Sequence, residues 1–214
     1  MIAYRSVVLD VDSTVSAVEG IDWLAGRRDA SVAATVSALT AAAMDAKVPL
    51  DEVYGRRLAI IRPTRAEIEA LSVVYIAAVV PGARDAIQAW RDSGVHVALV
   101  SGGLRDAILP LAAWLGLQPG DVHAVEVEYA SSVATHVRAA SPLAMRGGKA
   151  TVVASLPLAR KILAAGDGAT DAELAPVVDR FVAFTGVVRR NAVVAAADGE
   201  VSSFAELTPI VLGV

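Results

Sequence analysis

The sequence contains no cysteine and little histidine, which removes several kinds of site at once. With no cysteine among its 214 residues, the chain has neither disulfides nor thiolate metal sites. Its three histidines, His96, His123 and His136, are scattered and none lies near a serine elbow, which argues against a serine triad or a histidine zinc site. The net charge of -4, without interleaved basic and aromatic residues, argues against a nucleic-acid partner. We therefore expect a small-molecule partner.

Long apolar runs are also missing, although 55% of the residues are hydrophobic. The longest charge-free stretches, such as 31–44 and 107–120, are shorter than the roughly 18 to 20 residues that a membrane-spanning helix needs. No charged-then-apolar leader opens the sequence, so we expect no membrane partner and a cytoplasmic location. The length suits one large domain or a domain with an insertion, as a monomer or a homodimer.

The first apolar run is followed directly by polar residues. The Val7-Val8-Leu9 segment predicts a strand buried on both faces at the centre of a parallel sheet. Asp10, Asp12, Ser13 and Thr14 follow it. In open α/β sheets, the ligand crevice lies at the carboxyl ends of the strands, which makes this run a candidate active site. Taken alone, the run is equally compatible with a turn and a helix cap, because Asp and Ser are common turn residues.

The next sixty residues show helical rather than strand patterns. We expect helices at 20–25, 31–44 and 50–61, and another opened by the capping-box pattern Thr64-x-x-Glu67. Four helices inserted after a catalytic strand indicate a cap, and caps exclude water and complete substrate contacts. The predicted domains are a core of residues 1–15 and 76–214 and a helical cap of residues 16–75.

Alternation of helices and strands resumes after Pro81 and predicts an α/β fold. Strands are expected at 95–100, 161–165 and 181–184, and helices at 83–90, 104–111, 187–196 and 204–212. Val125, Val127 and Tyr129 alternate like one strand, with 133–137 as its hairpin partner. The Gly147-Gly148-Lys149 turn opens a helix with a cation at its start, where the helix dipole disfavours positive charge. Such a lysine suggests a functional purpose.

The strand ends bring one set of polar residues into a single crevice: Asp10, Asp12, Ser101, Lys149, Asp167 and Asp171. Four carboxylates would repel one another unless a cation neutralised them, and oxygen ligands of this kind favour Mg²⁺. A phosphoryl group is the natural ligand, because the cation, the lysine, the serine hydroxyl and the backbone N–H groups of glycine-rich turns all favour it.

These residues resemble the motifs of a known family. Asp10-Val11-Asp12-Ser13-Thr14, Ser101-Gly102-Gly103, Lys149 and Gly166-Asp167-Gly168-Ala169-Thr170-Asp171 resemble the four motifs of the haloacid dehalogenase superfamily of phosphatases. Their order, and the helical insertion after the first motif, resemble its phosphoserine phosphatase branch over essentially the whole chain. The resemblance implies a three-layer, Rossmann-like parallel-sheet core with an inserted helical-bundle cap. Two positions depart from a common form of the family, Thr170 in place of Asn and Leu104 in place of Phe.

By this resemblance, the reaction uses two catalytic aspartates. Asp10 is the nucleophile that forms an aspartyl-phosphate, and Asp12 is the general acid and base. Ser101 and Lys149 complete the catalytic set. Asp10, Asp167 and the backbone carbonyl of Asp12 are implied to hold Mg²⁺, with Asp171 orienting the water ligands of the ion.

The resemblance also implies a substrate, O-phospho-L-serine, and a reaction, its hydrolysis to L-serine and phosphate as the last step of serine biosynthesis. Glu19 and Arg57 would grip the amino-acid end, whereas the neighbouring Arg56, Arg62 and Arg65 are expected to be solvated. The implied substrate-binding residues are Glu19, Met44, Arg57, Ser101, Gly102 and Thr170.

Other interpretations remain open from the sequence. A related phosphomonoesterase, or a phosphotransferase with an acceptor such as homoserine, would use the same chemistry. A receiver-type signalling domain also combines acids, a hydroxyl residue and a lysine at strand ends, but it needs neither a helical insertion nor an acid at the position of Asp12. A binding protein without activity is disfavoured, because no motif residue has been lost.

Overall fold

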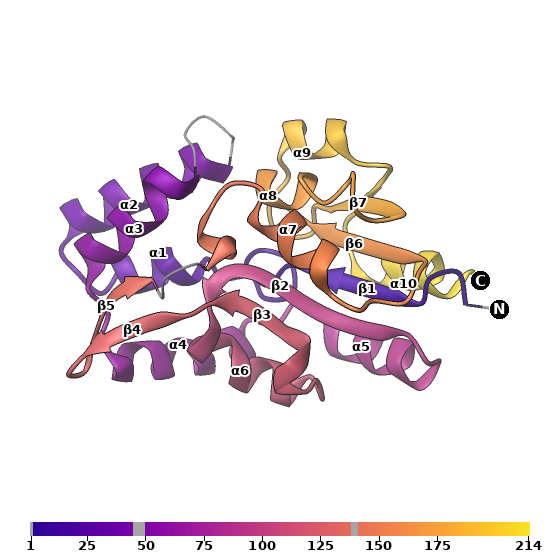
Figure 1. The fold of residues 1–214 in the computed structure, drawn as a ribbon, viewed down its shortest axis with the longest axis horizontal. Coiled ribbons are helices and arrows are strands. Elements are labelled where there is room, and N and C mark those ends of the chain that lie inside the picture. The colour runs from indigo at the N-terminus through magenta and orange to yellow at the C-terminus, as the bar shows by residue number, and fades with distance from the viewer. Residues whose placement is uncertain (1, 45–49, 138–140) are drawn as a thin grey trace.

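The computed structural model describes residues 2–44, 50–137 and 141–214. Six strands within these ranges form one sheet: β1 (Ser6–Leu9), β2 (His96–Leu104), β3 (Val122–Val125), β6 (Ile162–Gly166), β7 (Arg180–Phe184) and β8 (Glu200–Val201). Their order is β3-β2-β1-β6-β7-β8, and every neighbouring pair is parallel (Figure 1). The predicted α/β class is confirmed.

Strand β1 lies in the interior of the sheet and exposes neither face to solvent. All four of its residues are buried, and Val8 pairs with Ala98 of β2 on one side and Ala164 of β6 on the other. The N–H of Asp10 donates to the carbonyl of Ala165 at 3.1 Å, so the pairing extends one residue past the strand. The backbone of Asp10 is therefore held against the carboxyl end of β6.

Helices cover both faces of the sheet and give three layers. The core helices are α5 (Ala83–Asp92), α6 (Arg105–Trp114), α7 (Gly148–Ser155), α8 (Ala169–Ala172), α9 (Asn191–Ala196) and α10 (Phe204–Leu212), with short 3-10 turns η1 (Pro119–Asp121) and η2 (Pro142–Ala144). In Figure 1, α5 and α6 lie below the sheet and α7 and α8 lie above it. Helices α5 and α10 pack together through an aromatic cluster in which the Phe204 ring contacts Trp90 and Phe184.

Four helices are inserted between β1 and α5: α1 (Gly20–Ala25), α2 (Ala30–Met44), α3 (Leu50–Ile61) and α4 (Arg65–Ala77). The capping box predicted at the start of α4 is present, because Thr64 and Glu67 exchange side-chain to backbone hydrogen bonds. Helices α1 to α3 lie beyond the carboxyl end of β1, whereas α4 packs along α6 (Figure 1). Of the helices described, none is long and apolar enough to cross a membrane.

A hairpin from the second half of the chain joins the inserted helices. Strands β4 (Val127–Ala130) and β5 (Val133–Val137) are antiparallel, and β5 contacts α3. The N–H of Arg65 donates to the carbonyl of Ser132 at 2.7 Å, and the N–H of Ala134 donates to that of Pro63 at 2.8 Å. The hairpin thus ties the inserted helices to the part of the chain that follows β3.

Three sequence predictions need correction. Val125 and Val127 belong to different strands in different sheets, because the chain leaves the parallel sheet between them while the apolar alternation continues. The predicted strand at 95–100 runs on to Leu104, with a register shift against β3 where the Ser-Gly-Gly sequence lies. The helix expected at 187–196 begins only at Asn191, because Arg190 is its N-cap and has an extended backbone.

Candidate active site

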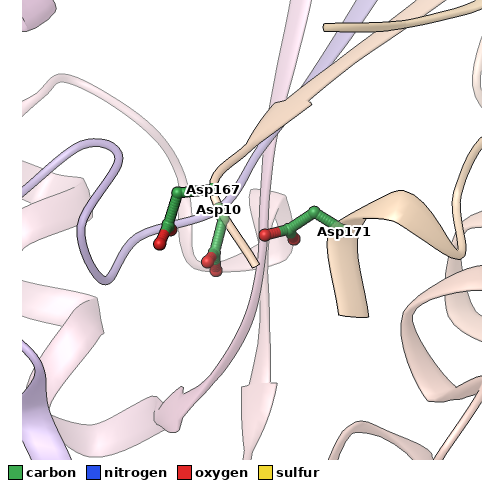
Figure 2. Close-up of side chains that lie close together, drawn as sticks. All are labelled: Asp10, Asp167 and Asp171. Atoms are coloured by element: carbon green, nitrogen blue, oxygen red, sulfur yellow. The ribbon is translucent and has the colours of Figure 1, made fainter. Parts of the chain in front are cut away.

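Three aspartates converge at the carboxyl edge of the sheet. Asp10 follows β1, Asp167 follows β6 and Asp171 lies in α8, and one carboxylate oxygen of each lies within 4.8 Å of the others. Figure 2 shows the three carboxylates gathered together. All three residues are buried. Residues far apart in the sequence meet here because β1 and β6 are neighbours in the sheet.

Lys149 is the cation at the centre of this cluster. It lies at the start of α7, and its Nζ is 2.8 Å from Asp10 Oδ1 and 2.5 Å from Asp171 Oδ1. Burial disfavours the charged form, but the two carboxylates outweigh it and raise the pKa of Lys149 above its ordinary value. The lysine therefore stays protonated, and its unfavourable position at a helix start is offset by the two acids.

The cluster holds more negative charge than the described cations neutralise. Burial, followed by the charge of Asp10, raises the pKa of Asp167 to about 8 and that of Asp171 to about 7. Burial also raises the pKa of Asp12 well above its ordinary value, with Glu19 and Asp10 adding to the effect. Buried carboxylates that resist ionisation in this way, with oxygen ligands only, fit a hard divalent cation.

A tyrosine that the sequence did not point to holds the side chain of Asp12. The hydroxyl of Tyr75, which is buried on α4, donates to Asp12 Oδ1 at 2.5 Å, and the N–H of Gly20 lies 3.4 Å from the same oxygen. These contacts orient the carboxyl group from the side of the inserted helices. No local motif marks Tyr75, because only the packing of α4 brings it to Asp12.

Three neutral residues of β2 and α8 line the pocket beside the acidic cluster. Ser101 is buried, and its Oγ accepts a hydrogen bond from the N–H of Gly103 at 3.0 Å. A Cβ added at Gly102 would lie 3.9 Å from the carbonyl oxygen of Leu143, which is ordinary van der Waals contact. Thr170 lies in α8 and lines the same pocket as Ser101 and Gly102. Hydroxyl and exposed backbone groups beside a lysine suit a bound phosphoryl group.

Most of the predicted site residues line one enclosed pocket of about 40 Å³ between the sheet edge and the inserted helices. They are Asp10, Asp12, Glu19, Arg57, Ser101, Gly102, Lys149, Asp167 and Thr170. Asp171 lies behind Lys149 and contacts it directly. Met44 ends α2, and its side chain lies outside the described part of the chain. The sequence reasoning did not identify the other lining residues, Ile21, Tyr54, Leu143 and Met145.

Arg57 enters this pocket from α3 and is almost completely buried, whereas Arg56, Arg62 and Arg65 are exposed, as predicted. Its Nη1 donates to Thr40 Oγ1 at 3.0 Å, and the Thr40 hydroxyl lies 2.6 Å from Asp22 Oδ1. Its Nε is buried and has no hydrogen-bond partner among the described residues. A buried cation with a free donor is costly unless a ligand completes its hydrogen bonds.

Arg190 is a second basic residue at the site, and the sequence reasoning missed it. Its Nε donates to Asp167 Oδ2 at 3.2 Å, and its Nη2 lies 3.8 Å from Glu19 Oε1. Glu19 Oε1 also accepts from the hydroxyl of Ser13 at 2.6 Å. The only sequence signal for Arg190 is its place after β7, whose carboxyl end lies on the same sheet edge.

The model of the haloacid dehalogenase-like hydrolases matches residues 7–176, which contain all four motifs. The chain belongs to this family. Within the family, the chain is 35% identical to a phosphoserine phosphatase of Rattus norvegicus over 206 residues, covering 94% of this chain and 91% of the relative. It is 34% identical to the human phosphoserine phosphatase with the same coverage. The predictions of a haloacid dehalogenase family member and of a phosphatase enzyme are confirmed.

Solved structures of this family share the fold. A phosphoserine phosphohydrolase-like protein from Francisella tularensis superimposes with a TM-score of 0.88 at 21% identity, covering 97% of this chain and 100% of the other. A phosphoserine phosphatase solved with bound substrate has a TM-score of 0.81 at 22% identity, covering 95% of this chain and 96% of the other. These likenesses support the Rossmann-like layered architecture.

Proposed function

We propose that this haloacid dehalogenase-like enzyme hydrolyses O-phospho-L-serine to L-serine and phosphate, with Mg²⁺, as the last step of serine biosynthesis. The observation that carries the substrate is the buried Arg57, which lines the pocket that also contains Asp10 and Lys149 and whose Nε has no partner among the described residues. The pocket thus offers a cation for a carboxylate next to the site for a phosphoryl group. The sequence identity to phosphoserine phosphatases supports the same substrate.

The buried aspartates offer oxygen ligands of the kind that Mg²⁺ prefers. Asp10, Asp167 and the backbone carbonyl of Asp12 would hold Mg²⁺, which would neutralise the nucleophile and the phosphoryl oxygens. Both oxygens of Asp171 already have partners, Lys149 Nζ at 2.5 Å and the N–H of Gly168 at 2.9 Å. The contact with Lys149 supports a role for Asp171 in orienting that lysine, and we propose that Asp171 also orients the water ligands of the ion.

In the first chemical step, a carboxylate oxygen of Asp10 attacks phosphorus and the bond from phosphorus to the serine oxygen breaks. Asp12 donates its proton to the departing alkoxide. The raised pKa of Asp12, caused first by burial, favours the protonated carboxyl group that this step needs. Tyr75 orients Asp12 for this transfer through its hydrogen bond at 2.5 Å.

The second step removes the phosphoryl group from Asp10 and returns a proton to Asp12. Asp12 accepts a proton from water, the resulting oxygen nucleophile attacks phosphorus, and the bond from Asp10 to phosphorus breaks to release phosphate. Lys149, the Ser101 hydroxyl and the backbone beside Gly102 stabilise the charge on the phosphoryl oxygens in both steps. All three groups line the pocket.

The amino-acid end of the substrate is recognised by the inserted helices, which we propose as a cap of residues 16–75. Arg57 would bind the carboxylate with its planar fork, and Glu19 would bind the ammonium group. A pocket of about 40 Å³ holds roughly three water molecules, which is less than a phosphomonoester needs. We propose that the cap moves away from the sheet to admit the substrate.

The proposed function is tested by phosphate release from phosphoserine, O-phosphoethanolamine and glucose 6-phosphate, with and without Mg²⁺. We expect phosphoserine to be preferred, the activity to require Mg²⁺ and Asp10→Asn to be inactive. Equal rates on all three esters would refute the substrate. Phosphohomoserine formed on addition of homoserine would instead assign phosphoryl transfer, and a stable phosphoprotein without turnover would favour a signalling domain.

A further inference from the structure

The hydroxyl of Tyr54 is a buried polar group without a partner among the described residues. Tyr54 lies in α3, three residues before Arg57, and is only 2% exposed. Its hydroxyl oxygen makes no hydrogen bond to any described residue. Nearly all buried polar groups in folded proteins are hydrogen-bonded, so an exception calls for an explanation such as a missing ligand.

The position of this hydroxyl points to the ligand pocket. Tyr54 and Arg57 are separated by one helical turn and therefore lie on the same face of α3. The guanidinium carbon of Arg57 is 5.3 Å from the centre of the Tyr54 ring, and both residues line the pocket that contains Asp10. Two residues that line the same pocket thus each carry a buried donor, Tyr54 OH and Arg57 Nε, that has no partner in the described part of the chain.

The surroundings of Tyr54 leave its hydroxyl as a donor. Burial raises the pKa of Tyr54 above its ordinary value, so the group stays protonated at all physiological pH values. Arg57 cannot accept a hydrogen bond from it, because a guanidinium has donors only. The group that satisfies both residues must therefore be an acceptor with several lone pairs.

We propose that the Tyr54 hydroxyl donates a hydrogen bond to the substrate carboxylate beside Arg57, which makes Tyr54 a specificity-determining residue. A carboxylate can accept about four hydrogen bonds, so the guanidinium leaves room for this additional donor. The inference rests on the proposed function, since it assumes a substrate with a carboxylate. It adds a neutral donor to the charged pair Arg57 and Glu19.

The test is Tyr54→Phe, which removes a single oxygen atom. For phosphoserine we expect KM to rise about 10- to 100-fold, as for a lost hydrogen bond to a charged group, with kcat within about threefold of the wild type. O-Phosphoethanolamine has the phosphate and the ammonium but no carboxylate, so its KM should not change. The thermal midpoint of the ligand-free variant should equal or exceed that of the wild type, because the unpartnered hydroxyl is gone.

Tyr129→Phe is the matched control, because the hydroxyl of Tyr129 donates to Asp106 outside the pocket. It should leave KM for both substrates unchanged. An equal rise of KM for both substrates, or a lower thermal midpoint of Tyr54→Phe with an unchanged KM, would overturn the inference. Failure of the proposed function would look different, since the wild type itself would then show no preference for phosphoserine over O-phosphoethanolamine.

Discussion

The hydroxyl of Thr40 provides a sharp test of how the carboxylate site is built. Thr40 is buried in α2, accepts a hydrogen bond from Arg57 Nη1 at 3.0 Å and lies 2.6 Å from Asp22 Oδ1. The threonine thus connects the guanidinium to an acid that it does not contact directly. Thr40→Val keeps the shape of the side chain and removes these hydrogen bonds, together with a contact from the hydroxyl to the carbonyl of Val36 at 3.1 Å.

The size of the effect follows from the charge on Arg57. A hydrogen bond to a charged group contributes about 1.5–3 kcal/mol. If all of this free energy is lost from substrate binding, KM for phosphoserine rises about 10- to 150-fold, since 1.4 kcal/mol corresponds to a factor of ten. We expect kcat to stay within about threefold, because Arg57 would contact the substrate away from the phosphoryl group and would bind ground and transition states alike.

The assay compares kcat and KM for phosphoserine and O-phosphoethanolamine in Thr40→Val, in Arg57→Met and in the double variant. If Thr40 acts through Arg57, Thr40→Val should have no further effect on KM when Arg57 is absent. Thr35→Val is the matched control, because Thr35 lies on the same helix but is exposed, and its hydroxyl donates to the carbonyl of Ser31 at 2.8 Å.

Two results would refute this reasoning. The first is a loss of similar size on O-phosphoethanolamine, which would mean that the variant damages the site as a whole. The second is full additivity of Thr40→Val and Arg57→Met, which would mean that Thr40 does not act through the guanidinium.

Three further predictions concern the metal site and the stability of the fold. Because the pKa of Asp167 is raised to about 8 and that of Asp171 to about 7, the folded metal-free protein binds more protons than the unfolded chain from about pH 4 to pH 8. The free energy of unfolding of the metal-free protein should therefore fall as the pH rises through this window. Mg²⁺ binding should release protons and become tighter toward pH 8, which calorimetry in buffers of different ionisation heat measures. Binding without proton release would contradict this prediction. Arg28 lowers the pKa of Glu67 to about 2, so this pair stabilises the fold above about pH 4.5 and the effect is lost as the pH falls toward 2. Glu67→Gln should lower the free energy of unfolding by about 1 kcal/mol at pH 7, as measured by urea titration. If the difference in this free energy between variant and wild type stayed constant down to pH 2, the ion pair would be excluded as its cause. Finally, a Cβ added at Gly166 would lie 2.2 Å from Asp171 Cγ. Gly166→Ala should therefore lower the free energy of unfolding by about 1–3 kcal/mol and reduce kcat. A variant with the kcat and melting temperature of the wild type would show that the turn can relax.

The motifs at the strand ends could be found from the sequence because their chemistry is local. Asp10 and Asp12 follow a fully apolar strand, and Lys149 stands at a helix start that disfavours it electrostatically. The structure places these three residues, with Asp167, around one pocket. The sequence therefore predicted the acidic edge of the sheet, since a buried parallel strand has a defined end.

Residues whose role comes from packing could not be found in this way. No sequence motif marks Tyr54 or Tyr75. Only the fold shows that the hydroxyl of Tyr75 reaches Asp12 and that the hydroxyl of Tyr54 lacks a partner among the described residues. Arg190 was assigned to a helix interior, although it is the N-cap of α9 and contacts Asp167. Val127 continued the alternation of Val125, but it begins a hairpin that lies against α3.

The sequence by itself determined the α/β class, the inserted helices and the acidic, lysine-containing edge, because apolar periodicity and strand-end residues depend on neighbours along the chain. The tertiary structure alone decided which side chains from α3, α4 and the β7–α9 connection meet these acids. The physical reason is that a long polar side chain is directed by the packing of its whole element, and that packing is set by contacts between residues distant in sequence.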